Sequence, residues 1–256
     1  MTKSLILPLI LAFSLSAVAQ TPSAIEHELL GYLDAASKSG SYSGEYDEAK
    51  NTKANDAIRE TLERAGKRLD VLHFAFPKLK EYMSVATSRD AKLRIYSWDL
   101  ETGGTMHDFE SFFQFQGASG SVQTWSATDD PESAGGYYTE IFQLDTKSGP
   151  IYLANSNFIA QSNIHGQSIE AMRITGDKLD AKAKIIRTAS GLTNSVDFAY
   201  DPFSLKDRPE ELVSFDVAKQ QFSFPVVIED KLYENGRVTN RFITYRFNGQ
   251  YFVKVS

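Results

Sequence analysis

The chain has 256 residues, of which 42% are hydrophobic and 23% are charged, a composition typical of a globular rather than a disordered protein. Its 27 basic and 33 acidic residues give a net charge of −6, and no basic run occurs, which argues against nucleic acid or an anionic membrane surface as a partner. The absence of cysteine excludes disulfides, a thiol nucleophile and cysteine-ligated metal sites.

The first 19 residues have the pattern of a secretory signal peptide. Lys3 supplies the positive start, residues 5–18 are uncharged and mostly apolar, and Ala17-Val18-Ala19 forms a cleavage motif. The alternative, a membrane anchor, needs a run of about 18 apolar residues, and this run is shorter. We therefore predict a periplasmic or secreted protein that inserts into no membrane after cleavage. Because the leader holds one lysine and no acid, the mature charge is 26 basic against 33 acidic residues.

Two helices are predicted next. Ser23 and Glu26 fit a capping box, and the apolar positions that follow share one helical face: Ile25, Leu29, Leu33 and Ala36. This helix should end before Gly40. A second helix is predicted over about residues 45–65, with Gly66 at its end. Its apolar stripe is narrow and rich in alanine, so we expect it to pack on a surface rather than fill a core.

From about Met83 the pattern changes to strands and turns, and its densest signal is residues 92–116. Two runs rich in β-branched and aromatic residues flank a turn at residues 101–104, which predicts an antiparallel hairpin. In the second run Phe113 and Phe115 alternate with polar residues. This alternation predicts a strand with one buried face and one solvated face.

Further short strands recur at intervals of roughly ten residues, which favours a sandwich or barrel, with a small propeller as the alternative. The predicted strands cover about residues 122–127, 137–145, 151–158, 168–175, 183–188, 194–200, 211–217 and 222–228, and a final hairpin joins 238–247 to 250–255 through Asn248-Gly249. The sequence thus predicts an α+β fold with three parts: a signal peptide (1–19), a helical N-terminal segment (20–82) and a mostly antiparallel β domain (83–256).

No catalytic or cofactor motif is present. The nucleophile elbow, the phosphate-binding loop, the dinucleotide fingerprint and the zinc-protease helix motif are all missing. The four histidines, His27, His73, His107 and His165, have no metal-ligand spacing. We therefore predict no cofactor and no metal, and favour a protein that is not an enzyme.

The central hairpin holds the first candidate site, Trp98, Asp99 and His107. Trp98 and Asp99 could form a ligand rim on which a sugar or peptide stacks, or they could be a core aromatic and a turn-initiating acid. His107 is either a general base at the hairpin rim or an exposed turn residue. Asp99, Glu101 and Asp108 could also be a glycosidase's paired carboxylates, although acids beside a turn are usually solvated.

Two further candidates lie later in the chain. Residues 201–210 form a charged, proline-containing loop in which Asp207 and Arg208 could face a partner, or simply be solvated, with Arg208 paired locally. Arg241 and Tyr245 could present a polar patch on one strand face, or be an ordinary solvent face.

Three functions are consistent with these patterns. The first is an exported binding or interaction module of the bacterial envelope whose partner is an envelope protein or a glycan, possible subclasses being an inhibitor or immunity-type protein that blocks a cell-wall-active enzyme. The second is a hydrolase of glycans or peptides that uses Asp99, His107 or the 201–210 loop. The third is a structural component that adds a strand from a partner to an open sheet edge.

Overall fold

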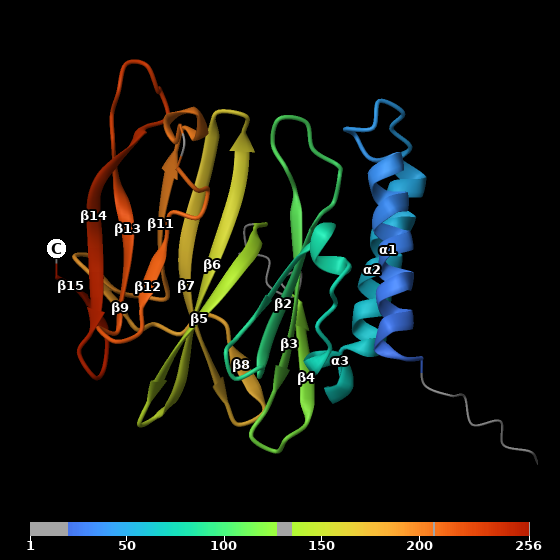
Figure 1. Ribbon diagram of the computed structural model, residues 1–256, viewed down its shortest axis with the longest axis horizontal. Coiled ribbons are helices and arrows are strands. Elements are labelled where there is room, and N and C mark those ends of the chain that lie inside the picture. Colours follow the sequence, from blue (N-terminus) through green and yellow to red (C-terminus); the bar gives the residue numbers. More distant parts are fainter. Residues whose placement is uncertain (1–19, 127–134, 207, 256) are drawn as a thin grey trace, which may run out of the picture.

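The computed structural model describes residues 20–126, 135–206 and 208–255. The predicted signal peptide and the candidate residue Asp207 lie outside these ranges. A layer of helices covers one face of a stack of three β-sheets (Figure 1). The predicted α+β class is confirmed, with two N-terminal helices followed by a mostly antiparallel β region. Within the described residues, no helix is long and apolar enough to cross a membrane.

The helical layer comes first in the chain. Its elements are α1 (Pro22–Ser39), α2 (Glu48–Ala65), the short α3 (Leu69–His73) and the 3-10 turn η1 (Leu79–Glu81). The N-cap of α1 differs from the prediction. It is Thr21 and not Ser23, and the Thr21 hydroxyl accepts from the Ala24 N–H at 3.3 Å. Glu26 does not close a capping box. It is buried, and its carboxylate accepts from the N–H groups of Lys78 and Leu79 at the start of η1.

The strands form three sheets. The first sheet has the order β1 (Ser84–Thr87), β2 (Leu93–Asp99), β3 (Phe109–Gln116), β4 (Val122–Ser126). The second has the order β11 (Ser195–Tyr200), β7 (Ile164–Thr175), β6 (Gly149–Gln161), β5 (Tyr137–Thr146), and β8 (Lys178–Asp180) pairs with β7. The third has the order β10 (Gly191–Thr193), β9 (Ile186–Thr188), β15 (Phe252–Lys254), β14 (Arg237–Phe247), β13 (Gln221–Ile228), β12 (Ser214–Asp216).

Both predicted hairpins are present. β2 and β3 pair antiparallel from Leu93–Phe115 to Asp99–Phe109. β14 and β15 are joined by the four residues 248–251, a longer connection than the two-residue turn predicted at Asn248-Gly249. Gly249 has a φ of +99°, which favours glycine and explains why a turn here could be found from the sequence. Among the described strands only β9 and β15 pair in parallel.

The predicted solvated face of β3 is wrong, because the helices cover it. Glu110 is 5% exposed and Gln114 is completely buried. Arg59 of α2 donates from Nε and Nη2 to the two carboxylate oxygens of Glu110 at 2.7 and 2.6 Å. Gln114 donates to the carbonyl oxygens of Gly66 and Arg68. The polar residues in the strand pattern therefore mark a buried, hydrogen-bonded interface and not a surface.

Of the four apolar clusters in the described residues, the three largest hold the layers together, and the small fourth one contains Tyr200, Leu205 and Val238. The helices pack on the first sheet, the first sheet packs on the second, and the second packs on the third. The second sheet is therefore a middle layer, and β6 is buried on both faces along most of its length. Its sides face different cores: Tyr152 and Ala154 face the first sheet, whereas Ile151 and Leu153 face the third. The arrangement is a face-to-face sandwich enlarged by a third sheet.

Candidate functional site

A pocket of about 370 Å³ lies where β2 extends beyond the start of β1. The first residue of β1, Ser84, pairs with Ser97, so β2 continues past its neighbour through Trp98 and Asp99. The start of β5 lies on the other side of this opening. The pocket therefore sits at the junction of the first and second sheets.

Aromatic side chains and hydroxyl groups line this pocket together. The aromatic lining residues are Tyr82, Trp98, Phe109 and Tyr137, and the hydroxyl residues are Ser84, Ser97 and Thr139. Lys80, Glu81 and Asp99 are the charged residues of the lining. Tyr82 is 61% exposed and free to adjust to a ligand, whereas the Phe109 and Tyr137 rings pack with centroids 4.7 Å apart. Such a mixture of apolar faces with a few polar groups is typical of small-molecule sites.

The hydroxyl groups of the pocket also hold the two sheets together. Ser97 Oγ accepts from the Tyr138 N–H at 3.1 Å and is hydrogen-bonded to Ser111 Oγ at 2.8 Å. Ser111 in turn donates to the Gly136 carbonyl at 2.9 Å, and Ser84 donates to the Tyr138 carbonyl. The pocket wall is thus fixed by hydrogen bonds across the sheet junction, which makes it a preformed site.

Asp99, at the end of β2, forms a close pair with His107. Asp99 Oδ2 lies 2.5 Å from His107 Nδ1, and Asp99 Oδ1 accepts from the Glu101 N–H at 2.8 Å. The His107 backbone N–H donates to the Ile159 carbonyl of β6 at 3.1 Å. No residue in the described parts of the chain hydrogen-bonds His107 Nε2. The carboxylate therefore orients the imidazole and leaves its second nitrogen available.

The loop between α1 and α2 encloses this pair from the other side. The ring of Tyr42 stacks on His107 with centroids 4.7 Å apart. Ser41 donates its N–H to the Glu101 carbonyl at 2.8 Å and its hydroxyl to the Gly103 carbonyl. Gly103 is required here, because a Cβ at this position would lie 1.8 Å from the Met106 carbonyl oxygen. The predicted glycine turn thus serves a close approach between two loops.

The surroundings of the pair are acidic. Burial and the nearby carboxylates of Asp99, Glu101 and Asp108 raise the pKa of Tyr42 to about 12. Burial, followed by the charge of Asp99, also raises the pKa of Glu101. Both shifts follow from concentrating negative charge in a partly dehydrated place. This end of the molecule therefore favours ligand groups that donate hydrogen bonds or carry positive charge.

Trp98 lines the inner wall of the pocket, but it is a core residue and not an exposed rim residue on which a ligand could stack. Its side chain is 1% exposed, and its indole Nε1 donates to Asn55 Oδ1 of α2 at 3.0 Å. Asn55 and Asn51 both donate to the Leu100 carbonyl, at 2.9 and 3.0 Å. The role of Trp98 is to position the end of β2, because these contacts fix the backbone on either side of Asp99.

The remaining candidate residues lie elsewhere and do not form one site. Arg208 fastens its loop to β14 by donating to the Thr239 carbonyl at 2.9 Å and to the Asn240 side chain. Arg241 is exposed, whereas Tyr245 is 7% exposed and stacks on Phe222 in the core between the second and third sheets. Arg241 and Tyr245 therefore do not share one polar patch, and Arg208 has the local pairing that the alternative interpretation expected.

Sequence reasoning missed most of the pocket. Tyr82, Phe109 and Tyr137 come from three separate segments, and no local pattern marks them as neighbours. Tyr42 was also missed, since it lies in a small polar break between two helices. One usable signal was the position of Tyr82 and Tyr137 at the beginnings of strands, because strand ends and loops position functional side chains more often than strand centres do.

The chain matches no protein-family model, no curated protein and no solved structure. Its function is therefore inferred from the geometry of this site and from the sequence.

Proposed function

We propose that the protein is an exported binding module of the bacterial envelope, and that the pocket beside Asp99 holds a sugar ring of a glycan. The observation that carries this proposal is the combination of Tyr82, Phe109 and Tyr137 with hydroxyl and carboxylate groups in one pocket of about 370 Å³. This volume lies within the range of about 300–1,000 Å³ found for small-ligand sites. The export itself is inferred from the leader pattern of residues 1–19.

The chemistry of the wall suits a sugar. A sugar ring has apolar C–H faces that pack on aromatic rings, and hydroxyl groups around its edge that both donate and accept hydrogen bonds. Thr139 and Ser84 supply hydroxyls, and Asp99 supplies an acceptor in an acidic setting. The charged lining residues are Lys80, Glu81 and Asp99, so the pocket carries both signs of charge, and a neutral polar ligand such as a sugar suits it.

A hydrolase that acts on the same glycan is the second candidate, and the Asp99–His107 pair favours it. The 2.5 Å contact orients the imidazole as in catalytic acid–base arrangements. Among the described residues, however, no serine or threonine hydroxyl is hydrogen-bonded to His107. We therefore place binding first and treat hydrolysis as an outcome to be tested with His107→Gln.

The test is a titration of the mature chain, from Gln20 onward, with fragments of cell-wall glycan, and isothermal calorimetry measures the binding. Tyr82→Ala should weaken binding roughly fivefold to thirtyfold, since removing an aromatic contact costs about 1–2 kcal/mol. Phe203→Ala is the matched control, because Phe203 is 69% exposed and does not line the pocket.

Two results would decide between the candidates. If the fragments bind and remain intact, and Tyr82→Ala lowers their affinity whereas Phe203→Ala does not, the chain is a binding module. If the fragments are cleaved and His107→Gln stops the cleavage without abolishing binding, the chain is a hydrolase. Equal effects of Tyr82→Ala and Phe203→Ala would contradict the assignment of this pocket.

A further inference from the structure

Thr139 is the extra residue of a β-bulge at the wall of the pocket beside Asp99. The pairing of β5 with β6 shifts register between Tyr138 and Glu140, so Thr139 has no partner residue on β6. A bulge of this kind turns a side chain out of the regular alternation of its strand. Thr139 is partly exposed and lines the pocket. The bulge therefore places one hydroxyl group in the pocket wall.

Two buried asparagines of β6 occupy both acceptor positions of this hydroxyl. Asn155 and Asn157 are 1% and 6% exposed, and each donates from Nδ2 to Thr139 Oγ1 at 3.2 Å. Asn157 Nδ2 also donates to the Tyr137 carbonyl at 3.5 Å, which an amide oxygen could not do. Asn155 Oδ1 has no partner in the described chain, and the opposite amide orientation would leave N–H donors unpaired there, which is rarer. A hydroxyl has two lone pairs and one proton, so only the proton of Thr139 remains for a ligand.

The protons of the other two pocket hydroxyls are already used. Ser84 donates its proton to a backbone carbonyl of β5 across the sheet junction. Ser111 donates its proton to the Gly136 carbonyl, so Ser97 is the donor in the hydrogen bond between Ser97 and Ser111. Thr139 has no acceptor for its proton among the described residues. Its hydroxyl is thus held as a donor, directed away from the two buried amides.

Aromatic rings lie beside this donor. Tyr137 precedes Thr139 by two residues on β5, and its ring packs on that of Phe109 in the pocket lining. A ligand group that fits here needs an oxygen that accepts a hydrogen bond and an apolar part that packs on an aromatic ring. An acetyl group has both on one carbon, a carbonyl oxygen and a methyl group. A sugar hydroxyl supplies only the acceptor.

We propose that the pocket beside Asp99 selects a sugar that carries an acetamido group, and that Thr139 determines this specificity by donating to the acetamido carbonyl oxygen. Asn155 and Asn157 are positioning residues, because they fix the hydroxyl as a donor but do not line the pocket. Asp99 supplies an acceptor for N–H or hydroxyl groups of the same sugar. This inference rests on the proposed binding of a glycan in this pocket and adds which sugar is bound.

The test compares two trisaccharides with the same backbone. Triacetylchitotriose carries an acetamido group on each ring where cellotriose carries a hydroxyl. In isothermal calorimetry, the mature chain should bind triacetylchitotriose about threefold to tenfold more tightly, the typical net contribution of one hydrogen bond. Thr139→Val keeps the shape of the side chain and removes the donor, so it should remove this preference and leave the cellotriose affinity unchanged. Thr139→Ser restores the hydroxyl and should restore the preference.

A further variant tests the positioning role. Asn157→Ala leaves Thr139 in place but frees one of its lone pairs, so the hydroxyl can also accept from a sugar hydroxyl. The preference for triacetylchitotriose should then decrease although the pocket lining is unchanged. This variant keeps the proposal testable if thermal unfolding shows that Thr139→Val does not fold.

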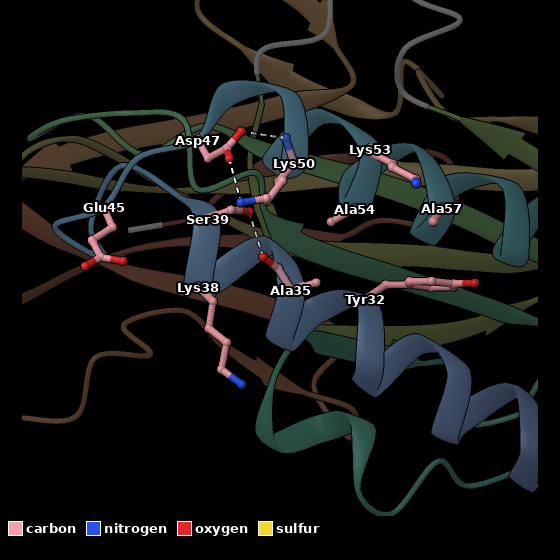
Figure 2. Close-up of a pocket in the computed structure, with 10 residues that line it drawn as sticks. All are labelled: Tyr32, Ala35, Lys38, Ser39, Glu45, Asp47, Lys50, Lys53, Ala54 and Ala57. Carbon is pink, nitrogen blue, oxygen red and sulfur yellow. Dashed lines mark hydrogen bonds and ion pairs between the residues drawn. The ribbon is translucent and has the colours of Figure 1, made fainter.

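The groove between α1 and α2 provides the control for binding elsewhere on the molecule. Its volume is about 500 Å³, and it shares no lining residue with the pocket beside Asp99. Figure 2 shows Ala35 among the residues that line this groove. Because Ala35 is exposed, Ala35→Leu should narrow the groove without disturbing the core, and it should leave the affinity for both trisaccharides unchanged.

The outcomes separate this inference from the proposed function. If the two trisaccharides bind equally and Tyr82→Ala weakens both, the glycan pocket stands and the acetamido selection fails. If the preference survives in Thr139→Val, the assignment of Thr139 is wrong. If neither trisaccharide binds, or if Ala35→Leu weakens both, the proposed function fails together with this inference.

Discussion

The interface between the helices and the first sheet differs in kind from the interface between the second and third sheets. Buried polar side chains cross the first one: Glu110 pairs with Arg59, Gln114 bonds to the end of α2, and Trp98 bonds to Asn55. Aromatic rings fill the second one: the Phe222 ring stacks on Tyr245 on the inner face of the third sheet, and Phe198 of the second sheet stacks on Phe224 of the third with centroids 5.3 Å apart.

This difference suggests that one interface mainly stabilises the fold, whereas the other mainly orients the residues of the site. Aromatic residues bury a large apolar area, and the hydrophobic contribution of that burial does not depend on direction. Hydrogen bonds between buried groups contribute less net free energy, but they tolerate only one geometry. The pocket beside Asp99 lies next to the polar interface, and Asn55 and Asn51 hold the backbone directly after Asp99. The site is therefore built where orientation is most strictly defined.

The largest expected effect comes from breaking the aromatic interface. Phe222 is completely buried, so Phe222→Ala should leave a cavity and lower the free energy of unfolding by about 3–5 kcal/mol. Urea denaturation followed by circular dichroism measures this loss. Because Phe222 does not contact the pocket beside Asp99, glycan affinity measured well below the melting temperature should stay the same. A loss of affinity as large as the loss of stability would refute the proposed division.

The next effect comes from the buried ion pair of the polar interface. Glu110 is 5% exposed and its partner Arg59 is 30% exposed, so Glu110→Leu should cost about 2–4 kcal/mol by removing the buried partner of Arg59, which keeps only its more exposed contact with Asp56. Replacing both residues, as Arg59→Met with Glu110→Leu, should cost less than Glu110→Leu alone. Chemical denaturation of Arg59→Met, Glu110→Leu and the double variant gives the coupling energy, and additive losses would contradict the pairing.

A smaller loss of stability is expected at Asn55, with a local effect on the site. Asn55→Leu removes the acceptor for the Trp98 indole and one of the two donors to the Leu100 carbonyl, which should cost about 1–3 kcal/mol. The end of β2 should then loosen, and the His107 ring signals in an NMR spectrum should shift. Unchanged His107 signals would show that the polar interface does not position the Asp99–His107 pair.

The sequence predicted the local elements and failed where distant segments meet. Phe113 and Phe115 alternate as a strand should, and Asn248-Gly249 marks its hairpin turn, because both signals depend on neighbouring residues only. The burial of Gln114 depends instead on a helix that ends about fifty residues earlier, and polar residues on a strand ordinarily indicate solvent. The residue pattern of a strand does not show whether another element of the fold will cover its polar face.

The candidate site was predicted in part for the same reason. Asp99 and His107 flank one hairpin, so their approach follows from the β2–β3 pairing that the sequence indicated. Tyr82 and Tyr137 meet them only because β1 and β5 lie side by side, joined by the hydrogen bond from Ser84 to the Tyr138 carbonyl. Trp98 is the core aromatic that the alternative interpretation expected, whereas Tyr245, a candidate for a polar patch, is buried by a neighbouring layer.

The smallest effect should come from Glu170, which tests whether the interface between the first and second sheets resembles the polar or the aromatic one. Burial raises the pKa of Glu170 despite a hydrogen bond of 2.8 Å from the Tyr138 hydroxyl. A raised pKa means that the folded state binds the proton more tightly than the unfolded state, so stability falls as the pH rises above about 4.5.

Glu170→Gln keeps an acceptor for Tyr138 and cannot ionise, so it should remove this fall. The variant and the original chain should be nearly equal in stability at pH 4, and the variant should be more stable at pH 8. Denaturation curves at both pH values measure the difference, and Glu211→Gln is a control for loss of an acidic charge at an exposed position. If Glu170→Gln is instead less stable at pH 8, the ionised carboxylate is held favourably by its hydroxyl neighbours. The interface between the first and second sheets would then resemble the polar interface between the helices and the first sheet. Two of the three interfaces between layers would in that case position residues as well as bury apolar surface.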